Sequence, residues 1–407
     1  MFDLSVCLIV KNEEEVISRC LECCKKFADE IIVVDTGSTD KTKELAFGFT
    51  DKIFTFPWND NFADARNLSF SKATKEYIMW LDADDFITQE NINKILNLKK
   101  QSEKFDVFMC KYLMDFDENN NANFSFFRER ILKRSLGFVW EGFVHEVITP
   151  KGKVHYTNIE VEHRKIKKNS DVSRNLNIYK KALKNNHKFS PREQYYYSRE
   201  LFYHKKYKQC IIELKKYLKL NDAYTPNILG AYILLGECFL ALGKIDDALK
   251  TCFEAIRTQG PNSELCCLIA RCYENRKDII QSIFWYNSSL ISPVQKGGFV
   301  RESYAKLIPA IALTKLYFDK GEINKSYHFH QLAKQENPHH PSVVFNERFF
   351  ENYLKILNIK KKTEKIGFFI VFLIIFLKFE HRLCLHLFLY YLQRTKNELF
   401  FCQTNLA

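Results

Sequence analysis

Four apolar runs follow one another in the first part of the chain, and helix-like segments separate them. A short unbroken apolar run is typical of a strand buried within a parallel sheet. The segments between the runs begin near Lys11, Lys41 and Asn61, with residues that suit helix caps and first turns. This alternation predicts an α/β, Rossmann-like domain with a mainly parallel sheet and helices on both faces. The runs are Leu4–Val10, Glu30–Asp35, Lys52–Phe56 and Glu76–Leu81.

Carboxylates follow two of these runs. Asp35 closes the second run, and Asp82 and Asp84 come directly after the fourth. Ligands of open α/β sheets bind at the carboxyl ends of the strands, and carboxylates this close together repel one another unless a cation lies between them. Oxygen ligands suit Mg²⁺ or Mn²⁺, so the pattern predicts a metal site. The alternative is a solvated turn in which Asp84 or Asp85 caps the next helix.

Charge and cysteine content limit the class of protein. The 407-residue chain has a formal net charge of +12, but its Lys and Arg are spread along the sequence without a nucleic-acid-binding signature. We therefore expect no nucleic acid partner, but an attraction to anions such as nucleotide diphosphates. The 13 cysteines follow no repeating frame and no secretory signal precedes Leu4, so we expect reduced thiols in the cytoplasm. Cys20, Cys23 and Cys24 lie in a helical pattern, which favours buried helix cysteines over a metal site.

The first part of the chain resembles the family 2 glycosyltransferases of the GT-A fold, which use nucleotide-diphosphate sugars. The resemblance covers roughly residues 1–165 and rests on four motifs in the right order and spacing. These motifs are Lys11-Asn12-Glu13, the stretch from Val33 to Thr42, Ala65-Arg66-Asn67, and the stretch from Leu81 to Asp84.

The resemblance implies roles for individual residues. Asp35 would contact the base or ribose, Arg66 would help to hold the nucleotide, and Asp84 would be the direct ligand of a metal ion bound to the diphosphate. From the residues alone, Asp35 would be a strand-end cap and Arg66 a surface residue of a helix. The other nucleotide-sugar residues that the resemblance implies are Lys11, Glu13 and Asp82.

A later segment resembles a narrower subgroup. Phe105–Tyr112 has a strand pattern, and Phe124–Leu132 alternates aromatic and charged residues as in an antiparallel edge strand. The following segment, Phe138–Glu146, is similar to the W-x-G-x-V-H-E segment of bacterial peptide S-glycosyltransferases of the sublancin type. That similarity implies that Glu146 is the general base and that His163 lies near the metal and the diphosphate.

Each of these roles has an alternative. Inverting transfer needs one base on the side of the sugar opposite the leaving diphosphate, and His145 could be that base if Glu146 only orients it. Glu146 could instead form a salt bridge with Arg128 or Arg130. His163 could be a neutral histidine that finishes a strand.

From Asn175 onward the pattern changes to paired helices. The expected hinges lie near residues 206, 243, 276 and 321, and the motif from Leu235 to Ala248 is similar to the 34-residue tetratricopeptide pattern. Residues 175–341 are therefore expected to form an α-helical, tetratricopeptide-like solenoid whose concave face can hold a peptide or another partner. An irregular helical bundle without a ligand is the alternative.

Residues 342–407 form a hydrophobic tail. The uncharged run Ile366–Leu377 has twelve residues, fewer than the roughly twenty that span a bilayer, and a second apolar stretch extends from Leu383 to Leu392. The tail could be an interfacial anchor that makes peripheral membrane contact, a last pair of buried helices, or a sequence unrelated to the ancestral carboxyl end.

Together these observations predict a cytoplasmic inverting glycosyltransferase, with membrane association as the alternative location, and three parts: residues 1–165, 175–341 and 342–407. The expected donor is a UDP-hexose, most simply UDP-glucose, and the expected cofactor is Mg²⁺ or Mn²⁺. The acceptor is either a Cys or Ser of a peptide, or a cell-surface saccharide or lipid-linked glycan. A non-catalytic scaffold is the rival outside the enzyme class, although the intact carboxylate set argues against it.

Overall fold

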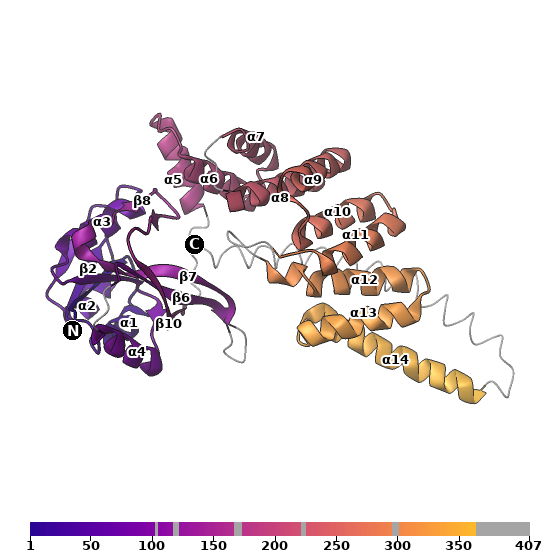
Figure 1. Cartoon of the computed structure of the whole chain (residues 1–407), viewed down its shortest axis with the longest axis horizontal. Coiled ribbons are helices and arrows are strands. Elements are labelled where there is room, and N and C mark those ends of the chain that lie inside the picture. Colours follow the sequence, from indigo (N-terminus) through magenta and orange to yellow (C-terminus); the bar gives the residue numbers. More distant parts are fainter. Residues whose placement is uncertain (102–104, 117–121, 167–172, 221–224, 295–300, 364–407) are drawn as a thin grey trace. The chain divides into compact units, whose positions relative to one another are not determined.

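The computed structural model describes residues 1–101, 105–116, 122–166, 173–220, 225–294 and 301–363 (Figure 1). Contacts divide the chain into two compact units, and the first contains Met1–His187. The second begins at Lys188 and is helical throughout its described part. The α/β domain followed by a helical region, as predicted from the sequence, is confirmed.

The first unit is built on an eight-stranded sheet with the order β3-β2-β1-β4-β7-β6-β10-β5. Four of the seven pairings among these described strands are parallel, including β1 with β2 and with β4. All four predicted parallel strands are present. The strands are β1 (Leu4–Val10), β2 (Glu30–Asp35), β3 (Ile53–Thr55), β4 (Tyr77–Asp82), β5 (Asp85–Phe86), β6 (Val107–Phe116), β7 (Ala122–Lys133) and β10 (Val154–His163).

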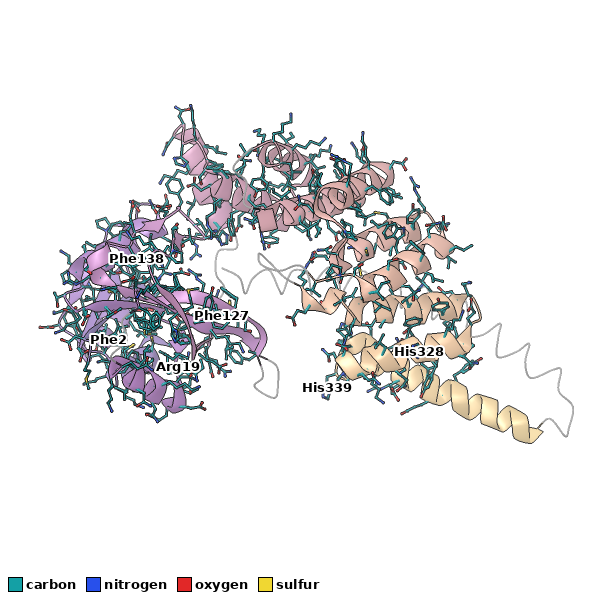
Figure 2. All side chains as sticks on the ribbon, viewed as in Figure 1. Phe2, Arg19, Phe127, Phe138, His328 and His339 are labelled. Atoms are coloured by element: carbon teal, nitrogen blue, oxygen red, sulfur yellow. The ribbon has the colours of Figure 1, made fainter. Side chains whose placement is uncertain are left out.

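Each face of the sheet has its own apolar core. Leu4, Val6 and Leu8 of β1 pack with α1 (Ile17–Cys24), α2 (Thr42–Phe47) and α4 (Gln89–Lys99) on one face. Cys7 points to the other face, where α3 (Phe62–Lys72) packs with a small second sheet of β8 (Trp140–Glu141) and β9 (Val147–Ile148). Phe2 and Phe138, labelled in Figure 2, belong to the first and second core respectively.

Helix α1 begins later than the sequence pattern suggests, at Ile17 rather than near Lys11. Asn12 has a left-handed backbone, with φ of 55°, so the chain cannot enter a helix there. The backbone N–H of Glu13 donates to Thr42 Oγ1 at 2.7 Å. The acidic residues after β1 therefore belong to a loop at the sheet edge.

Strand β7 is not an edge strand, so that prediction is wrong. It lies between β4 and β6 and is antiparallel to both. The register shifts so that Ile131 faces Phe108 while Glu129 faces Met109, which makes Arg130 the extra residue of a β-bulge. Arg130 is 0% exposed, and its charge is buried rather than solvated.

The first unit continues beyond the expected boundary at residue 165. Helix α5 (Arg174–Lys184) belongs to it, because Tyr179 is buried and its hydroxyl donates to the carbonyl oxygen of Val144 at 3.3 Å. The Phe143 and His187 rings are 4.7 Å apart in a T-shaped contact. The boundary therefore lies between His187 and Lys188.

The second unit begins as four successive helix pairs (Figure 1). A left-handed residue lies at each predicted hinge: Lys205, Gly243, Lys277 and Gly321, with φ between 56° and 77°. Such a residue ends one helix and turns the chain back, which confirms the predicted pairing. The helices are α6 (Pro191–Tyr203), α7 (Tyr207–Tyr217), α8 (Thr225–Ala241), α9 (Ile245–Gln259), α10 (Ser263–Asn275), α11 (Ile279–Ile291), α12 (Leu307–Asp319) and α13 (Ile323–Glu336).

A further helix, α14 (Pro341–Thr363), starts where the repeats were expected to end. Phe350 is buried and stacks on His330 of α13, with ring centroids 5.2 Å apart. His330 Nε2 also lies 2.7 Å from a Glu347 carboxylate oxygen. The apolar runs Ile366–Leu377 and Leu383–Leu392 lie outside the described residues. No helix in the described ranges is both long enough and apolar enough to cross a bilayer.

Eleven cysteines fall in the described part of the chain, and each is buried. Cys20, Cys23 and Cys24 face the core from α1, as expected. Burial raises the pKa of the Cys7 thiol well above its usual range and raises that of Cys110 to about 11. These thiols are apolar packing groups.

Candidate active site

The predicted carboxylates meet at one edge of the sheet. Val10 of β1 is in register with Asp35 of β2, and Ile9 is in register with Asp82 of β4. The chain moves outward from β1 to β2 and β3 and then crosses to β4, so the strand order reverses between β1 and β4. Ligands of such sheets bind at the carboxyl ends of the strands beside this reversal.

Hydrogen bonds join the loops that follow β1 and β2. Ser38 Oγ accepts from the Asn12 N–H at 3.0 Å, and Asn12 Oδ1 accepts from the Thr39 N–H at 2.8 Å. Asp35 is 2% exposed, and its carboxylate accepts from the backbone N–H groups of Gly37 and Ser38 at 3.2 and 3.1 Å. Asp35 therefore ends β2, and its side chain also stabilises the turn that follows the strand. Lys11 is exposed and Glu13 half-buried on the same loop pair.

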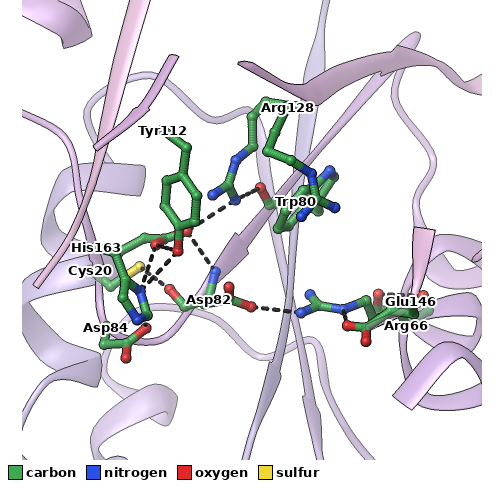
Figure 3. A network of polar contacts seen from close by, with 12 residues as sticks. Cys20, Arg66, Trp80, Asp82, Asp84, Tyr112, Arg128, Glu146 and His163 are labelled. Carbon is green, nitrogen blue, oxygen red and sulfur yellow. Dashed lines mark hydrogen bonds and ion pairs between the residues drawn. The ribbon is translucent and has the colours of Figure 1, made fainter. Parts of the chain in front are cut away.

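Arg66 connects two carboxylates of the site (Figure 3). Its Nη2 donates to Asp82 Oδ1 at 2.7 Å, and its Nε donates to Glu146 Oε1 at 2.6 Å. The guanidinium packs beside the rings of Trp80 and Trp140, 5.2 and 4.8 Å from their centroids, and the two rings meet each other edge to face at 4.9 Å. Arg66 is thus buried rather than a surface residue of its helix, and it is the ion-pair partner of Glu146. The suggested pairing of Glu146 with Arg128 or Arg130 is wrong.

Burial and neighbouring charges shift the pKa values of Asp82 and Arg66 in opposite directions. Burial alone would raise the pKa of Asp82, but the nearby Arg66 and Arg130 guanidinium groups hold it well below its usual range. Burial alone would lower the pKa of Arg66, and Asp82 and Glu146 outweigh that effect. Both groups therefore stay ionised throughout the ordinary pH range.

Glu146 and His145 lie in the segment between β8 and β9. Gly142 has φ of 100° and His145 has φ of 56°, so the segment turns sharply twice before Glu146. Only Gly adopts the first conformation without strain, which explains the Gly in the Trp-x-Gly pattern. Both His145 and Glu146 are half-buried.

A second cluster contains Asp84, Asp85 and His163, whose candidate ligand atoms all lie within 4.8 Å of one another. His163 Nδ1 is 3.2 Å from Asp84 Oδ1 and 2.8 Å from the Tyr112 hydroxyl. Burial alone would lower the pKa of His163, but its hydrogen bonds to Asp84 and Asp85 raise it to about 10. His163, at the end of β10, is thus brought to the carboxylates from a distant part of the sequence.

Asp85 is hydrogen-bonded to residues around the cluster. Its Oδ2 accepts from the Asp82 N–H at 2.9 Å and from Arg130 Nη1 at 3.0 Å. Its Oδ1 accepts from the Tyr112 hydroxyl at 2.8 Å. The cap of the next helix is Thr88, so the alternative of a solvated turn with Asp84 or Asp85 as the cap is wrong.

Two groups of this cluster, Asp84 and His163, have the chemistry of a divalent-cation site. Asp84 offers carboxylate oxygens, and His163 offers an imidazole nitrogen. Within the described residues, His163 Nε2 is buried and has no hydrogen-bond partner. Such oxygen and nitrogen donors suit Mg²⁺ or Mn²⁺. Asp84 and His163 can therefore hold the predicted ion, whereas the Asp85 oxygens are already occupied.

A concavity of about 380 Å³ lies beside the Asp84 turn. Arg19 Nη2 donates to the carbonyl oxygens of Asp84 and Arg164, at 3.4 and 2.9 Å. Both arginines line the concavity together with Glu162, whose carboxylate pairs with Arg164 Nε at 2.7 Å, so the wall carries charges of both signs next to the cluster. Its lining residues are Arg19, Phe86, Thr88, Glu162 and Arg164.

Sequence reasoning missed Tyr112, Arg130 and Trp80. Trp80 stacks with Arg130 at 3.7 Å, and its Nε1 donates to the Glu129 carbonyl oxygen at 2.6 Å. The charged run at residues 128–130 was the available signal, because three charges inside an apolar strand are unusual. The partners of Arg130 lie in β4, β5 and β6 and could not be found from spacing.

Comparisons with known proteins agree with this geometry. Residues 5–153 match the family model described as Glycosyl transferase family 2. The first unit therefore contains a segment that is similar to the family 2 glycosyltransferases.

Individual relatives extend the match. The chain is 30% identical to the SPbeta prophage-derived glycosyltransferase SunS of Bacillus subtilis, over 58% of this chain and 58% of that protein. It is 38% identical to a TPR repeat-containing protein of Synechococcus elongatus, over 25% of this chain and 26% of that protein. The chain thus spans less than two thirds of the length of either relative. A solved thermophilic TPR protein of Thermus thermophilus covers 45% of this chain and 91% of its own length, with 18% identity and a TM-score of 0.35.

Proposed function

We propose that this chain is an inverting glycosyltransferase that moves a hexose, most simply glucose, from a UDP-sugar to a Cys or Ser of a peptide. The similarity to the family 2 glycosyltransferases supports the reaction class. The observation that carries the proposal is the arrangement of Asp82, Asp84 and Glu146 at one sheet edge, where Arg66 links the strand-end carboxylate to the candidate base.

In the proposed reaction, Glu146 takes the proton of the acceptor S–H or O–H group. The acceptor atom forms a bond to C1 of the sugar while the bond from C1 to the diphosphate oxygen breaks, and its electron pair leaves with UDP. Asp35, Lys11 and Glu13 hold the nucleotide. Asp84 and His163 would hold Mg²⁺ or Mn²⁺, and the bound ion would supply positive charge next to the leaving diphosphate. An α-linked donor then gives a β-linked product.

The peptide acceptor is supported by the similarity of the Trp140–Glu146 segment to peptide S-glycosyltransferases. Paired helices such as those of the second unit commonly present a peptide-binding surface. A cell-surface saccharide or lipid-linked glycan is the alternative acceptor, and comparing both acceptor types in one assay distinguishes them. A cytoplasmic location and a peripheral membrane contact through the tail remain parts of the proposal.

The first experiment measures UDP-glucose hydrolysis by the purified chain with Mn²⁺, because water can replace an unknown acceptor. Glu146→Gln keeps the size of the side chain but removes the proton acceptor, so turnover should fall by about 10²–10⁴ while UDP affinity stays near wild type. His145→Ala should have a smaller effect. Glu141→Gln is the matched control, since Glu141 is exposed in the same segment.

Two results would contradict the proposal. A wild-type protein that neither binds UDP nor hydrolyses UDP-sugars would leave the non-catalytic scaffold as the better explanation. A fully active Glu146→Gln enzyme, or an α-linked product seen in the anomeric proton spectrum, would remove Glu146 from the mechanism.

A further inference from the structure

One face of α3 holds the segment that carries Glu146. Phe62, Arg66, Asn67 and Phe70 are spaced so that they share a face of the helix. The Phe62 N–H donates to the Phe143 carbonyl oxygen at 3.0 Å, and the Phe70 ring meets the Trp140 ring at 6.0 Å, edge to face. The helix therefore contacts the segment along its length.

Asn67 makes the most specific of these contacts. Its Nδ2 donates to the Trp140 carbonyl oxygen at 3.0 Å, and its Oδ1 accepts from the Trp140 N–H at 2.8 Å. A side-chain amide is well suited to both bonds, because it carries a donor and an acceptor on one planar group. Asn67 thus fixes the backbone of the segment six residues before Glu146.

Arg66 fixes the other end of this segment, at Glu146. Its Nε binds Glu146 Oε1, and its Nη2 binds Asp82, which the strand holds in place. Trp80 and Trp140 cover the guanidinium, and the whole residue is 8% exposed. Glu146 Oε1 is therefore occupied, while Oε2 has no hydrogen-bond partner within the described ranges.

We propose that Arg66 and Asn67 are positioning residues that hold Glu146 with Oε2 toward the acceptor, and that Arg66 acts through Glu146 rather than by contacting the nucleotide. This inference rests on the proposed function, because it takes Glu146 as the base. It differs from the role implied by the resemblance, in which Arg66 holds the nucleotide. The physical reason is that the cation is buried beside the rings of Trp80 and Trp140, and that two carboxylates occupy its Nε and Nη2 groups.

A double-mutant cycle tests the role of Asn67, with UDP-glucose hydrolysis in Mn²⁺ as the readout. Asn67→Ala should lower kcat by about tenfold to a hundredfold with KM for UDP-glucose unchanged, because a misplaced base affects only the chemical step. In the Glu146→Gln background the same substitution should change turnover by less than about twofold, since the base is already lost. Asn97→Ala, at an exposed position in α4, is the matched control.

If Asn67→Ala lowers turnover in the Glu146→Gln background as much as it does in the wild-type protein, the inference is overturned. Asn67 would then act independently of Glu146. Thermal scans of each variant show whether the domain is folded. If the Asn67→Ala protein is unfolded, Asn67→Ser keeps a smaller hydrogen-bonding side chain and replaces it in the cycle.

UDP titration calorimetry tests the role of Arg66. Arg66→Lys keeps the charge between Asp82 and Glu146 but loses the fork that binds both, so kcat should fall about tenfold or more while the Kd for UDP changes by less than about threefold. A Kd raised tenfold or more would show that Arg66 contacts the nucleotide and would overturn the inference. That result would leave the proposed function intact, because the proposed function is tested separately by the use of UDP-sugars by the wild-type protein and by the linkage of the product.

Discussion

The buried ion pair of Arg130 and Asp85 predicts a large loss of stability when one partner is removed. Both side chains are 0% exposed, and Arg130 Nη1 lies 3.0 Å from Asp85 Oδ2. Arg130→Met keeps a long side chain against the Trp80 and Tyr112 rings, so the loss of packing is small. The substitution removes the closest ion-pair partner of the buried Asp85 carboxylate. Among the described residues it leaves only the more distant His163, whose Nδ1 is 3.6 Å from Asp85 Oδ1, as an ion-pair partner.

The size of the effect follows from this geometry. Removing one partner of a buried ion pair costs about 3–5 kcal/mol of the free energy of unfolding. For a unit of this size, 1 kcal/mol lowers Tm by about 2–4 °C, so the Tm of the first unit should fall by about 6–20 °C. Adding Asp85→Asn removes the stranded charge and keeps an acceptor oxygen. The double variant should therefore regain at least about half of the loss.

Differential scanning calorimetry of the full chain measures this effect, and the endotherm that shifts identifies the first unit. Arg134→Met is the control, since Arg134 is exposed just after β7 and should change Tm by at most about 2 °C. An Arg130→Met protein within about 3 °C of wild type would refute the reasoning. A double variant no more stable than the single one would do the same.

Three other predictions concern separate features. Asp84→Asn should weaken UDP binding in Mn²⁺ about tenfold or more by calorimetry, and equal affinity in EDTA and Mn²⁺ would exclude the metal role. Burial of Glu30 opposes ionisation, but Lys52 and two hydroxyl groups outweigh it and lower the pKa of Glu30 from 4.5 to about 2. Stability from this carboxylate is present above about pH 4.5 and lost as the pH falls toward 2, so Glu30→Gln should flatten the acid unfolding curve in that window by circular dichroism. Truncation after Thr363 should leave UDP-glucose hydrolysis intact and reduce aggregation by light scattering, and an unfolded product would instead assign the tail to the core.

The elements with a regular pattern were predictable from sequence. The runs at Leu4, Glu30 and Glu76 are apolar without interruption, and a strand buried on both faces is the arrangement that removes such a run from water. The hinge at Gly243 was predictable for a similar local reason, because glycine adopts the left-handed conformation that ends a helix. Local signals of this kind need no knowledge of distant residues.

The parts that were missed depend on distant partners. Charged residues in β7 resemble a solvated edge, and only Asp85 and Tyr112, far away in sequence, explain why Arg130 can be buried. The alternative salt bridge of Glu146 was placed on Arg128 or Arg130, and the actual partner, Arg66, lies on a helix eighty positions earlier. Periodicity gives the faces of strands and helices, but it does not give which side chains meet across them.

The buried thiols can report on local opening of the folded structure around them. A buried cysteine reacts with a disulfide reagent such as DTNB only when the surrounding structure opens, so its modification rate measures a local opening free energy. Cys7 and Cys110 report on the sheet, while Cys252 and Cys267 report on the helical unit. In a chain truncated after Thr363, every remaining cysteine is one of these buried groups. When peptide mass mapping identifies the cysteine that has reacted, thiol kinetics can therefore follow the two units separately, without an attached dye or an engineered site.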